Sequence, residues 1–320
     1  MLSNQLLERI LATIPNRTIG LVGDLFLDRY LDIDPARDEP SVETGLTAYQ
    51  VVGVRAYPGA LGTVLNNLVA LGVGRCRPIA AVGDDGEGYE LRQALGAMRG
   101  VDAAGVLAAP GRRTPTYTKP MYGERELNRL DIKNRTPTPR AVEDAILAAL
   151  DSAWPALDAL LVLDQVSEAE CGTITTRVRE RIAELGAERP ERFILADSRE
   201  RIGLFRNVAL KPNERERAAG VGDDPNRAAF FTRGEAGIDL KAPGEPIRTV
   251  PAFPVSGPVD ICGAGDSCSA GIACAMVSGA TLEDAAAFGN LIASITIQQI
   301  GVTGTAPPER VRDRWKAVCG

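Results

Sequence analysis

Short apolar runs alternate along this chain with stretches of helical spacing, and this alternation restricts the fold more than any other feature. The apolar runs are 18–23, 78–82, 159–163, 193–196, 208–210 and 228–231. The helical stretches include 61–71, 87–98, 140–152 and 172–185. Strands that alternate with helices form a mostly parallel sheet covered by helices on both faces. We therefore expect an α/β fold of the Rossmann type, with ligands bound beyond the carboxyl ends of the strands.

Two segments interrupt this alternation. Residues 31–57 and 113–133 contain alternating or β-branched stretches, among them 49–54 and 114–119. Such stretches are typical of strands with one exposed face. We interpret the two segments as antiparallel strands of a small sheet, inserted in a single domain of residues 1–320. This sheet is expected to act as a lid that covers a site or pairs with another subunit.

The composition excludes several classes of function. Lys and Arg number 36 against 42 Asp and Glu, and the net charge of −6 argues against nucleic acid as the main partner. The chain has no histidine, so any general base is a carboxylate, Lys, Tyr or Cys. The six cysteines form no CxxC pair, which argues against a zinc site. No signal peptide and no apolar stretch of membrane-spanning length is recognisable, so we expect a cytoplasmic protein.

The segment 259–271 carries the strongest chemical signal. Gly263, Ala264 and Gly265 allow a ligand to approach the backbone closely, and a stretch of helical spacing follows them. A helix that starts here directs its free N–H groups and its positive dipole end at the ligand, which favours a phosphate. The carboxylate of Asp266 would repel that phosphate. We therefore expect Asp266 to take a hydroxyl proton as a general base; the alternative is an Asp that only caps the helix.

Four motifs in order resemble the PfkB/ribokinase family of carbohydrate kinases. They are 23–30 (GDLFLDRY), 58–72 (PGALGTVLNNLVALG), 211–216 (KPNERE) and 260–266 (DICGAGD). Within the family, the chain is most similar to the kinase domain of bacterial ADP-heptose synthases, which phosphorylates a heptose 7-phosphate. The resemblance implies a ribokinase-like fold with a β-sheet lid, and a homodimer formed through that lid. It also implies transfer of the γ-phosphoryl group of ATP, with Mg²⁺, to a hydroxyl of a sugar or sugar phosphate.

The same resemblance assigns roles to individual residues. Gly263, Ala264 and Gly265 would form an anion hole beside the base Asp266. The expected sugar-binding residues are Asp24, Asp28, Gly59, Gly62, Thr63 and Asp164. The expected nucleotide-binding residues are Lys211, Asn213, Glu216, Thr232, Gly234 and Asn290.

Asn213 and Glu216 resemble the pair that holds Mg²⁺, directly or through water. They could equally start a helix, because Asn is a good cap and acids suit the first turn. Asp260 corresponds to a residue beside which some relatives hold a monovalent cation such as K⁺. Arg199 is a further phosphate partner or a solvated surface charge.

The chain departs from the family pattern in its sugar-binding motifs. The second glycine and the asparagine of the usual G-G-A-[AG]-N signature are Ala60 and Thr63 here. The lysine that follows the aspartate in the heptose kinases is absent after Asp164. A nucleoside or hexose kinase of the same family therefore stays an alternative, as does a sugar- or nucleotide-binding relative without catalysis. We also expect no nucleotidyltransferase domain, which is often fused to heptose kinases.

Overall fold

A nine-stranded sheet forms the centre of the protein in the computed structural model, which describes residues 2–218 and 227–319. From one edge to the other the sheet runs β16 (Arg248–Val250), β15 (Ile238–Lys241), β14 (Ala229–Thr232), β13 (Ala209–Leu210), β12 (Phe193–Ser198), β11 (Ala159–Asp164), β1 (Thr18–Gly23), β6 (Arg75–Gly83) and β7 (Gly105–Ala109). The strands from β13 to β7 and the β13–β14 pair are parallel. This part of the α/β prediction is confirmed. The sequence analysis did not foresee β15 and β16, which extend the sheet in antiparallel fashion.

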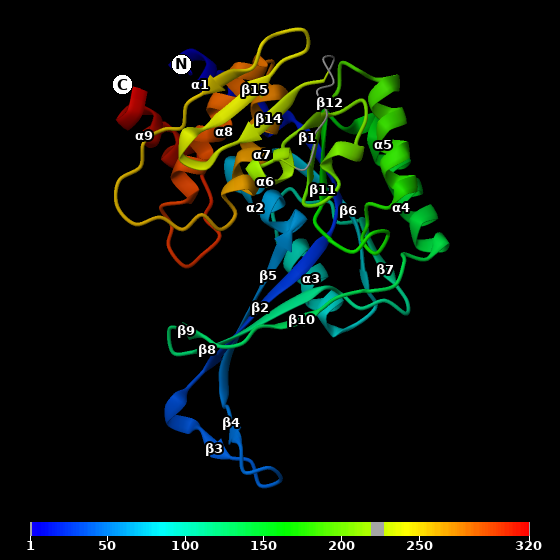
Figure 1. Ribbon diagram of the computed structural model, residues 1–320, viewed down its shortest axis with the longest axis vertical. Helices are drawn as coiled ribbons and strands as arrows, with labels where there is room; N and C mark the ends of the chain where they lie inside the picture. Colours follow the sequence, from blue (N-terminus) through cyan, green and yellow to red (C-terminus); the bar gives the residue numbers. More distant parts are fainter. Residues whose placement is uncertain (1, 219–226, 320) are drawn as a thin grey trace.

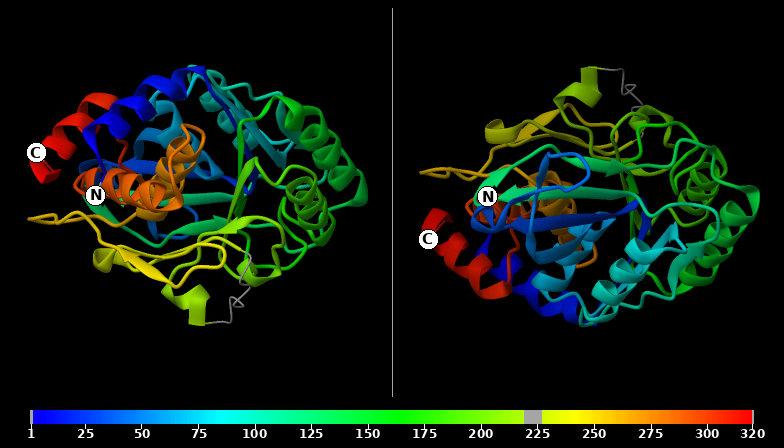
Figure 2. Two further views of the ribbon diagram at one scale, coloured as in Figure 1. Left: turned by 90° about the horizontal axis from the view of Figure 1, so that it is seen from above. Right: turned by 90° about the horizontal axis from the view of Figure 1, so that it is seen from below.

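Helices cover both faces of this sheet (Figure 2). One face carries α1 (Asn4–Thr13), α2 (Leu61–Leu71), α7 (Ala264–Met276), α8 (Leu282–Thr296) and α9 (Pro308–Cys319). The other carries α4 (Arg140–Ala153) and α5 (Thr176–Glu188). In β11, Leu161 and Leu163 pack into the first layer, whereas Leu160 and Val162 pack into the second. Burial on both faces explains why this strand is apolar throughout rather than alternating.

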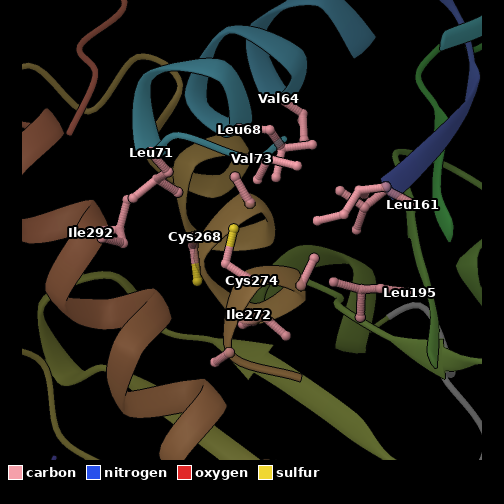
Figure 3. Close-up of a cluster of buried hydrophobic side chains, with 14 of the residues drawn as sticks. Val64, Leu68, Leu71, Val73, Leu161, Leu195, Cys268, Ile272, Cys274 and Ile292 are labelled. Atoms are coloured by element: carbon pink, nitrogen blue, oxygen red, sulfur yellow. The ribbon is translucent and has the colours of Figure 1, made fainter. Parts of the chain in front are cut away.

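Helix α7 lies in the middle of the first layer and packs closely on α2 and α8 (Figure 3). Its small residues make this possible. A Cβ atom at Gly271 would lie 3.0 Å from the Cα atom of Gly289 on α8. Larger side chains at this crossing would push α8 away. The small residues along α7 therefore allow close packing against its neighbours. Its N-terminus is the part of the helix that is expected to bind a ligand.

The strand order reverses between β1 and β11. The chain runs from β1 to β6 on one side and from β11 to β12 on the other. At such a reversal the connections leave in opposite directions, and a crevice opens beyond the carboxyl ends of the two strands. Asp24 follows β1 and Asp164 ends β11, so both lie at this reversal.

A second sheet projects from the main body beside this crevice (Figure 1). Its strand order is β10 (Leu130–Ile132), β8 (Thr116–Tyr122), β2 (Leu25–Ile33) and β5 (Val51–Ala60), and β9 (Arg125–Glu126) pairs with β8. The small separate sheet was predicted from 31–57 and 113–133. It starts earlier than predicted, at Leu25, and its central pair β2–β8 is parallel. Helix α3 (Gly86–Gly96) packs against β2 and β5.

The far end of this lid carries a hairpin of β3 (Glu39–Pro40) and β4 (Thr47–Ala48), which extends well beyond the body (Figure 1). Short 3₁₀ turns at Ile14–Asn16, Pro35–Arg37, Trp154–Ala156, Ile202–Leu204 and Gly234–Ala236 complete the described elements. Within residues 2–218 and 227–319, every helix is too short or too polar to cross a lipid bilayer.

Candidate active site

The N-terminus of α7 forms the centre of the candidate site. Gly263 caps the helix with a φ of 75°, which is in the left-handed region that glycine adopts without strain. A Cβ atom at this position would lie 2.6 Å from Cγ2 of Thr303 and 3.3 Å from Cγ2 of Thr63. Gly263 therefore allows the start of α2 and the loop before α9 to close around the start of α7.

Asp266 lies in the first turn of α7 and is half-buried. Burial raises its pKa to about 7, and the negative charge of Asp197 adds to this increase. The positive charges of Lys211 and Arg199 lower the pKa, while Asp28 raises it further. Asp28 belongs to the lid strand β2, so Asp266 lies where the lid and the main body meet. A carboxylate with a pKa near neutrality is suited to accept and release a proton.

A buried ion pair lies directly behind the glycine turn. The Nζ atom of Lys211 is 2.8 Å from Oδ2 of Asp197, and Lys211 is 4% exposed. The same Nζ atom would lie 3.5 Å from a Cβ atom at Gly265. Burial lowers the pKa of Lys211, but the attraction of Asp197, the hydrogen bond to it, and the interactions with Cys268 and Asp266 together outweigh burial and raise the pKa above the usual lysine value. A permanent positive charge therefore lies next to the backbone that is expected to bind phosphate.

Two loops are tied together on the other side of this turn. Oδ1 of Asp260 accepts the N–H of Cys262 at 3.0 Å, and Oδ2 accepts the N–H of Gly301 at 3.0 Å. The N–H of Ala264 donates to the carbonyl of Ile261 at 3.1 Å. The anion hole expected at Gly263–Gly265 stays a prediction. In the structure, the N–H of Ala264 already donates to Ile261 within the turn. The monovalent cation at Asp260 stays a prediction.

On the acceptor side, strand pairing brings Asp28 and Gly59 into contact. A Cβ atom at Gly59 would lie only 2.3 Å from Oδ2 of Asp28, so this glycine makes room for the carboxylate. Nζ of Lys119 on β8 lies 3.9 Å from Oδ1 of Asp28. Burial raises the pKa of Asp28, although Lys119 and Arg129 act in the opposite direction. Asp28 thus lies between Gly59 of β5 and Lys119 of β8.

Asp24 has a different environment from the one expected. Its carboxylate accepts three backbone N–H groups, from Gln165 (2.7 Å), Val166 (2.8 Å) and Thr173 (2.7 Å). Burial and the nearby charge of Asp164 raise its pKa to about 6, against the effect of these hydrogen bonds. Asp24 therefore holds the loop 165–173 in place, and any contact of Asp24 with a sugar stays a prediction.

Asp164 also has internal partners. It is 1% exposed and forms a bidentate ion pair with Arg201, with distances of 2.7 Å and 3.2 Å. The hydroxyl of Ser198 donates to the same carboxylate at 2.7 Å. These contacts join the ends of β11 and β12. They stabilise the buried negative charge of Asp164, so no bound sugar is needed to explain this residue.

The remaining residues of the second motif shape the start of α2. A Cβ atom at Gly62 would lie 2.3 Å from Cβ of Pro58, which requires glycine here. Thr63 is 8% exposed and lies beside Gly263. Asn67, one turn later, donates from Nδ2 to the carbonyl of Thr63 at 3.0 Å. The motif thus forms the seam between α2 and α7.

A pocket opens to solvent beyond the ends of β1 and β11. Its polar lining includes Asp24, Arg112, Tyr117, Lys133, Asn134 and Arg199. The ring of Tyr117 packs edge-on against Phe26 at 5.3 Å, and burial raises its pKa. Arg199 lines this pocket, and its positive charge lowers the pKa of Asp266. The pocket and the candidate base therefore belong to one region.

The nucleotide side begins with a reciprocal helix cap. Glu216 accepts the backbone N–H and the Nδ2 of Asn213, both at 2.8 Å, while Oδ1 of Asn213 accepts the N–H of Glu216 at 2.9 Å. This capping box starts α6 (Glu214–Ala218). Asn213 and Glu216 therefore do start a helix, as the alternative interpretation proposed. This capping role does not exclude a second role in holding Mg²⁺.

Magnesium fits this pair best through water. Both oxygens of Glu216 already accept a hydrogen bond, and burial raises its pKa. In residues 2–218 and 227–319, no three Cys, Asp or Glu side chains gather as a metal site would require. Magnesium in proteins commonly keeps several waters and uses one or two carboxylates together with substrate phosphates. Asn213 and Glu216 are compatible with that mode of binding.

The other expected nucleotide residues lie at or near the β14–β15 turn. The backbone N–H of Thr232 donates to the carbonyl of Pro212 at 2.9 Å, which links this turn to the KPN segment. Gly234 has a φ of 54° and lies in the left-handed region. Asn290 is 7% exposed and donates from Nδ2 to the carbonyls of Val250 and Pro251, both at 3.1 Å. Asn290 therefore holds the end of β16, and a contact with the base of the nucleotide stays a prediction.

The sequence analysis missed several charged residues of the site. Asp197 was recognised only as the residue after a strand, and Lys119 only as part of a lid strand. Arg112 and Lys133 had no motif around them. A polar residue at the carboxyl end of an apolar run, such as Asp197 in β12, is a signal that could have been used. The lid cations have no such signal, because their position depends on how the second sheet meets the first.

Solved structures share the fold of this chain. The ribokinase of Arabidopsis thaliana in complex with ribose and ATP has a TM-score of 0.67 at 17% identity, covering 94% of this chain and 99% of that one. An E. coli structure in complex with ATP and Mg²⁺ has a TM-score of 0.62 at 18% identity, with coverage of 94% and 99%. The protein thus has the ribokinase-like α/β fold, with a large sheet flanked by helices and a small separate sheet.

Sequence comparison gives a family match over part of the chain. Residues 200–309 match the family described as pfkB family carbohydrate kinase. This stretch, about a third of the chain, is thus similar to PfkB-family carbohydrate kinases. The bifunctional protein HldE of Caulobacter vibrioides is 29% identical over 306 residues. That alignment covers 89% of this chain and 61% of the relative, so the chain spans only part of the length of that protein.

Proposed function

We propose that the protein transfers the γ-phosphoryl group of ATP to a hydroxyl of a sugar that already carries a phosphate, with Asp266 as the general base. The observation that carries this proposal is the position of Asp266. It lies in the first turn of α7, directly after a glycine turn. The negative charge of Asp28 on the lid raises its pKa. Phosphoryl transfer depends on positioning and on charge stabilisation, and this site offers both.

In the proposed reaction, the carboxylate of Asp266 accepts the proton of the acceptor hydroxyl. The bond between that oxygen and the γ-phosphorus forms as the bond to the β–γ bridging oxygen breaks, and ADP leaves. Backbone N–H groups of the first turn of α7 and the ammonium group of Lys211 would face the negative charge of the transferring group. Asn213 and Glu216 would hold Mg²⁺ through water, and the ion would offset charge on the phosphates.

The pocket beside Tyr117 supports a phosphorylated acceptor. Arg112, Lys133 and Arg199 contribute three cationic side chains to its lining. Arg112 donates to the carbonyls of Cys171 (2.5 Å) and Thr136 (3.5 Å), and burial lowers its pKa. A phosphate is a ligand that such a cluster of guanidinium and ammonium groups recognises. The resemblance to heptose kinases points to a heptose phosphate, with an unphosphorylated hexose or a nucleoside as the alternative.

A kinase assay over a panel of acceptors tests this proposal. Asp266→Asn is expected to keep ATP binding and to lower kcat by about 10³-fold, because the proton then has no acceptor. Asp284→Asn is a matched control, since Asp284 also lies in the first turn of a helix, where its N–H donates to Thr281 at 3.1 Å. It should leave kcat unchanged.

Two results would contradict the proposal. An Asp266→Asn variant with a rate close to wild type would exclude the role as base. Equal rates with a sugar and with its phosphate ester would exclude the phosphate pocket. ATP or sugar binding without turnover on any acceptor would instead favour a binding protein without catalysis.

We further propose that two copies of the chain associate through the lid. Exposed large apolar side chains gather on the lid segments, including Val52 (55%), Val54 (57%) and Tyr57 (51%) on β5. Exposed apolar groups that are grouped on one element mark interaction surfaces more often than scattered ones do.

A further inference from the structure

Asp239 is a buried carboxylate outside the motifs, and it holds together the two segments expected to bind nucleotide. It lies on β15 and is 7% exposed. Its Oδ2 is 2.9 Å from Nη1 of Arg217, and its Oδ1 is 3.1 Å from Nη1 of Arg233. The hydroxyl of Thr249 donates to Oδ1 at 2.8 Å. These four side chains are called the Asp239 cluster below.

The first segment that the cluster holds is α6. This helix has five residues, and isolated helices of that length are not stable in water. Arg217 anchors it twice: its guanidinium pairs with Asp239 and lies 4.4 Å from the centre of the Phe231 ring. Glu216 is the residue next to Arg217, and its capping box with Asn213 depends on the same turn of helix.

The second segment is the β14–β15 turn. Arg233 lies between Thr232 and Gly234, the two turn residues assigned to the nucleotide side, and it pairs with Asp239 from there. Nε of Arg233 is also 3.7 Å from Oε1 of Glu214 on α6. Burial raises the pKa of Asp239, but hydrogen bonds from Thr249, Arg217 and Arg233 outweigh it and lower the pKa. The carboxylate is therefore charged and holds two guanidinium groups at once.

We propose that Asp239 is a positioning residue, which fixes α6 and the β14–β15 turn relative to each other so that both can contact ATP. The inference rests on the proposed function and goes beyond it, because Asp239 itself touches neither the expected sugar site nor the glycine turn. A site whose parts are held by a shared carboxylate binds ligand with less loss of conformational freedom. The acceptor side, with Asp28 and Gly59, does not depend on this cluster.

Direct binding of Mg·ATP, without any acceptor, tests the inference by titration calorimetry. Asp239→Asn and Arg217→Gln should each weaken binding by about tenfold, which is the usual effect of losing a group that orients ligand-binding residues. The double variant should bind no more weakly than Asp239→Asn, because both changes remove one interaction. The KM for the acceptor should stay unchanged. Backbone amides of 213–217 should exchange with deuterium faster in both variants, with no ligand present.

Glu8→Gln provides a matched control. Glu8 pairs with Arg312 through bonds of 2.9 Å, 3.2 Å and 2.9 Å and so joins α1 to α9 on the opposite side of the layer. This variant loses a more exposed ion pair, outside the Asp239 cluster, and should bind Mg·ATP as the wild type does. Arg217 is partly exposed, so Arg217→Gln decides the matter alone if Asp239→Asn does not fold.

The outcomes separate this inference from the proposed function. If the wild type binds Mg·ATP and both variants bind it equally well, the inference is overturned and the kinase proposal stands. Additive losses in the double variant would also overturn it, because they would show two independent effects. If the wild type itself binds no Mg·ATP, the proposed function fails first and the inference fails with it.

Discussion

Ala60 is the residue whose backbone conformation most clearly disagrees with its side chain. It precedes α2 with φ 53° and ψ −113°, a conformation that glycine adopts easily and alanine does not. The family signature commonly has glycine here. We expect Ala60→Gly to raise the free energy of unfolding by about 1 kcal/mol, measured by urea denaturation, because the strain relieved exceeds the added freedom of the unfolded chain.

Ala148→Gly serves as the control for this prediction. Ala148 is exposed in the middle of α4, where the backbone is helical. The same change in composition should here lower the free energy of unfolding by about 1 kcal/mol. A loss of stability in Ala60→Gly similar to that in Ala148→Gly would show that Ala60 is not strained.

The pKa of Asp266 predicts a pH dependence of activity. A general base works only when ionised, and burial raises the pKa of Asp266 to about 7. We therefore expect kcat/KM to fall as the pH is lowered through about 7, well above the range in which an ordinary aspartate titrates. Initial rates at subsaturating acceptor concentration between pH 5 and 9 measure this decrease in kcat/KM.

The same shift has a consequence for stability, with a definite sign. The folded protein disfavours the ionised form of Asp266, so this group lowers stability; the penalty is complete above pH 7 and shrinks as the pH falls from 7 to 3.8, the ordinary pKa of the unfolded chain. Asp266→Asn should accordingly melt at a higher temperature than wild type at pH 8. The difference should shrink toward pH 4. An equal difference at both pH values would mean that the carboxyl is not buried in the way described.

At the level of elements, the pairing of β2 and β5 positions the acceptor side. Gly59 leaves room for Asp28, since a Cβ atom would come within 2.3 Å of its Oδ2. We expect Gly59→Ala to displace this carboxylate and to lower kcat/KM for the acceptor on the order of tenfold or more. The KM for ATP should not change. Steady-state kinetics with each substrate varied in turn separate the two effects.

Gly53 is the matched control on the same strand. A Cβ atom there would lie 3.3 Å from Oδ2 of Asp32, further along the lid, which a small shift accommodates. Gly53→Ala should retain wild-type kinetics for both substrates. If both variants lose acceptor efficiency equally, the effect comes from the lid as a whole and not from Asp28.

Helices and strands were predictable where burial or capping leaves a clear pattern in the sequence. The strand over 159–163 was predicted because burial on both faces makes it apolar throughout. The helix predicted over 172–185 begins at Thr176, since Thr175 takes the cap position. The antiparallel β15 and β16 were missed, because short strands at the edge of a sheet carry only weak patterns.

For the molecule as a whole, the mostly parallel sheet with helices on both faces was predictable, whereas the partners of the charged groups were not. Strand ends point to a crevice by topology alone. The pairing of Asp164 with Arg201 and of Lys211 with Asp197 joins residues from different strand ends. Asp24 accepts hydrogen bonds from residues 165–173, which are far away in the chain. Such contacts depend on the assembled sheet, so motif order alone assigns Asp24 to the sugar and misses its structural task.

The lid makes a prediction about the whole assembly. Val52, Val54 and Tyr57 all lie on β5, and all three are exposed. If two copies associate through their lids, sedimentation velocity will show a dimer for the wild type at micromolar concentrations. A positive charge buried in the interface is unfavourable, so Val52→Lys/Val54→Lys or Tyr57→Lys should shift the protein to monomer. Leu204→Lys is the control, because Leu204 has the same 57% exposure as Val54 but lies on the main body. A wild-type monomer, or a dimer insensitive to both lid variants, would exclude association through this sheet.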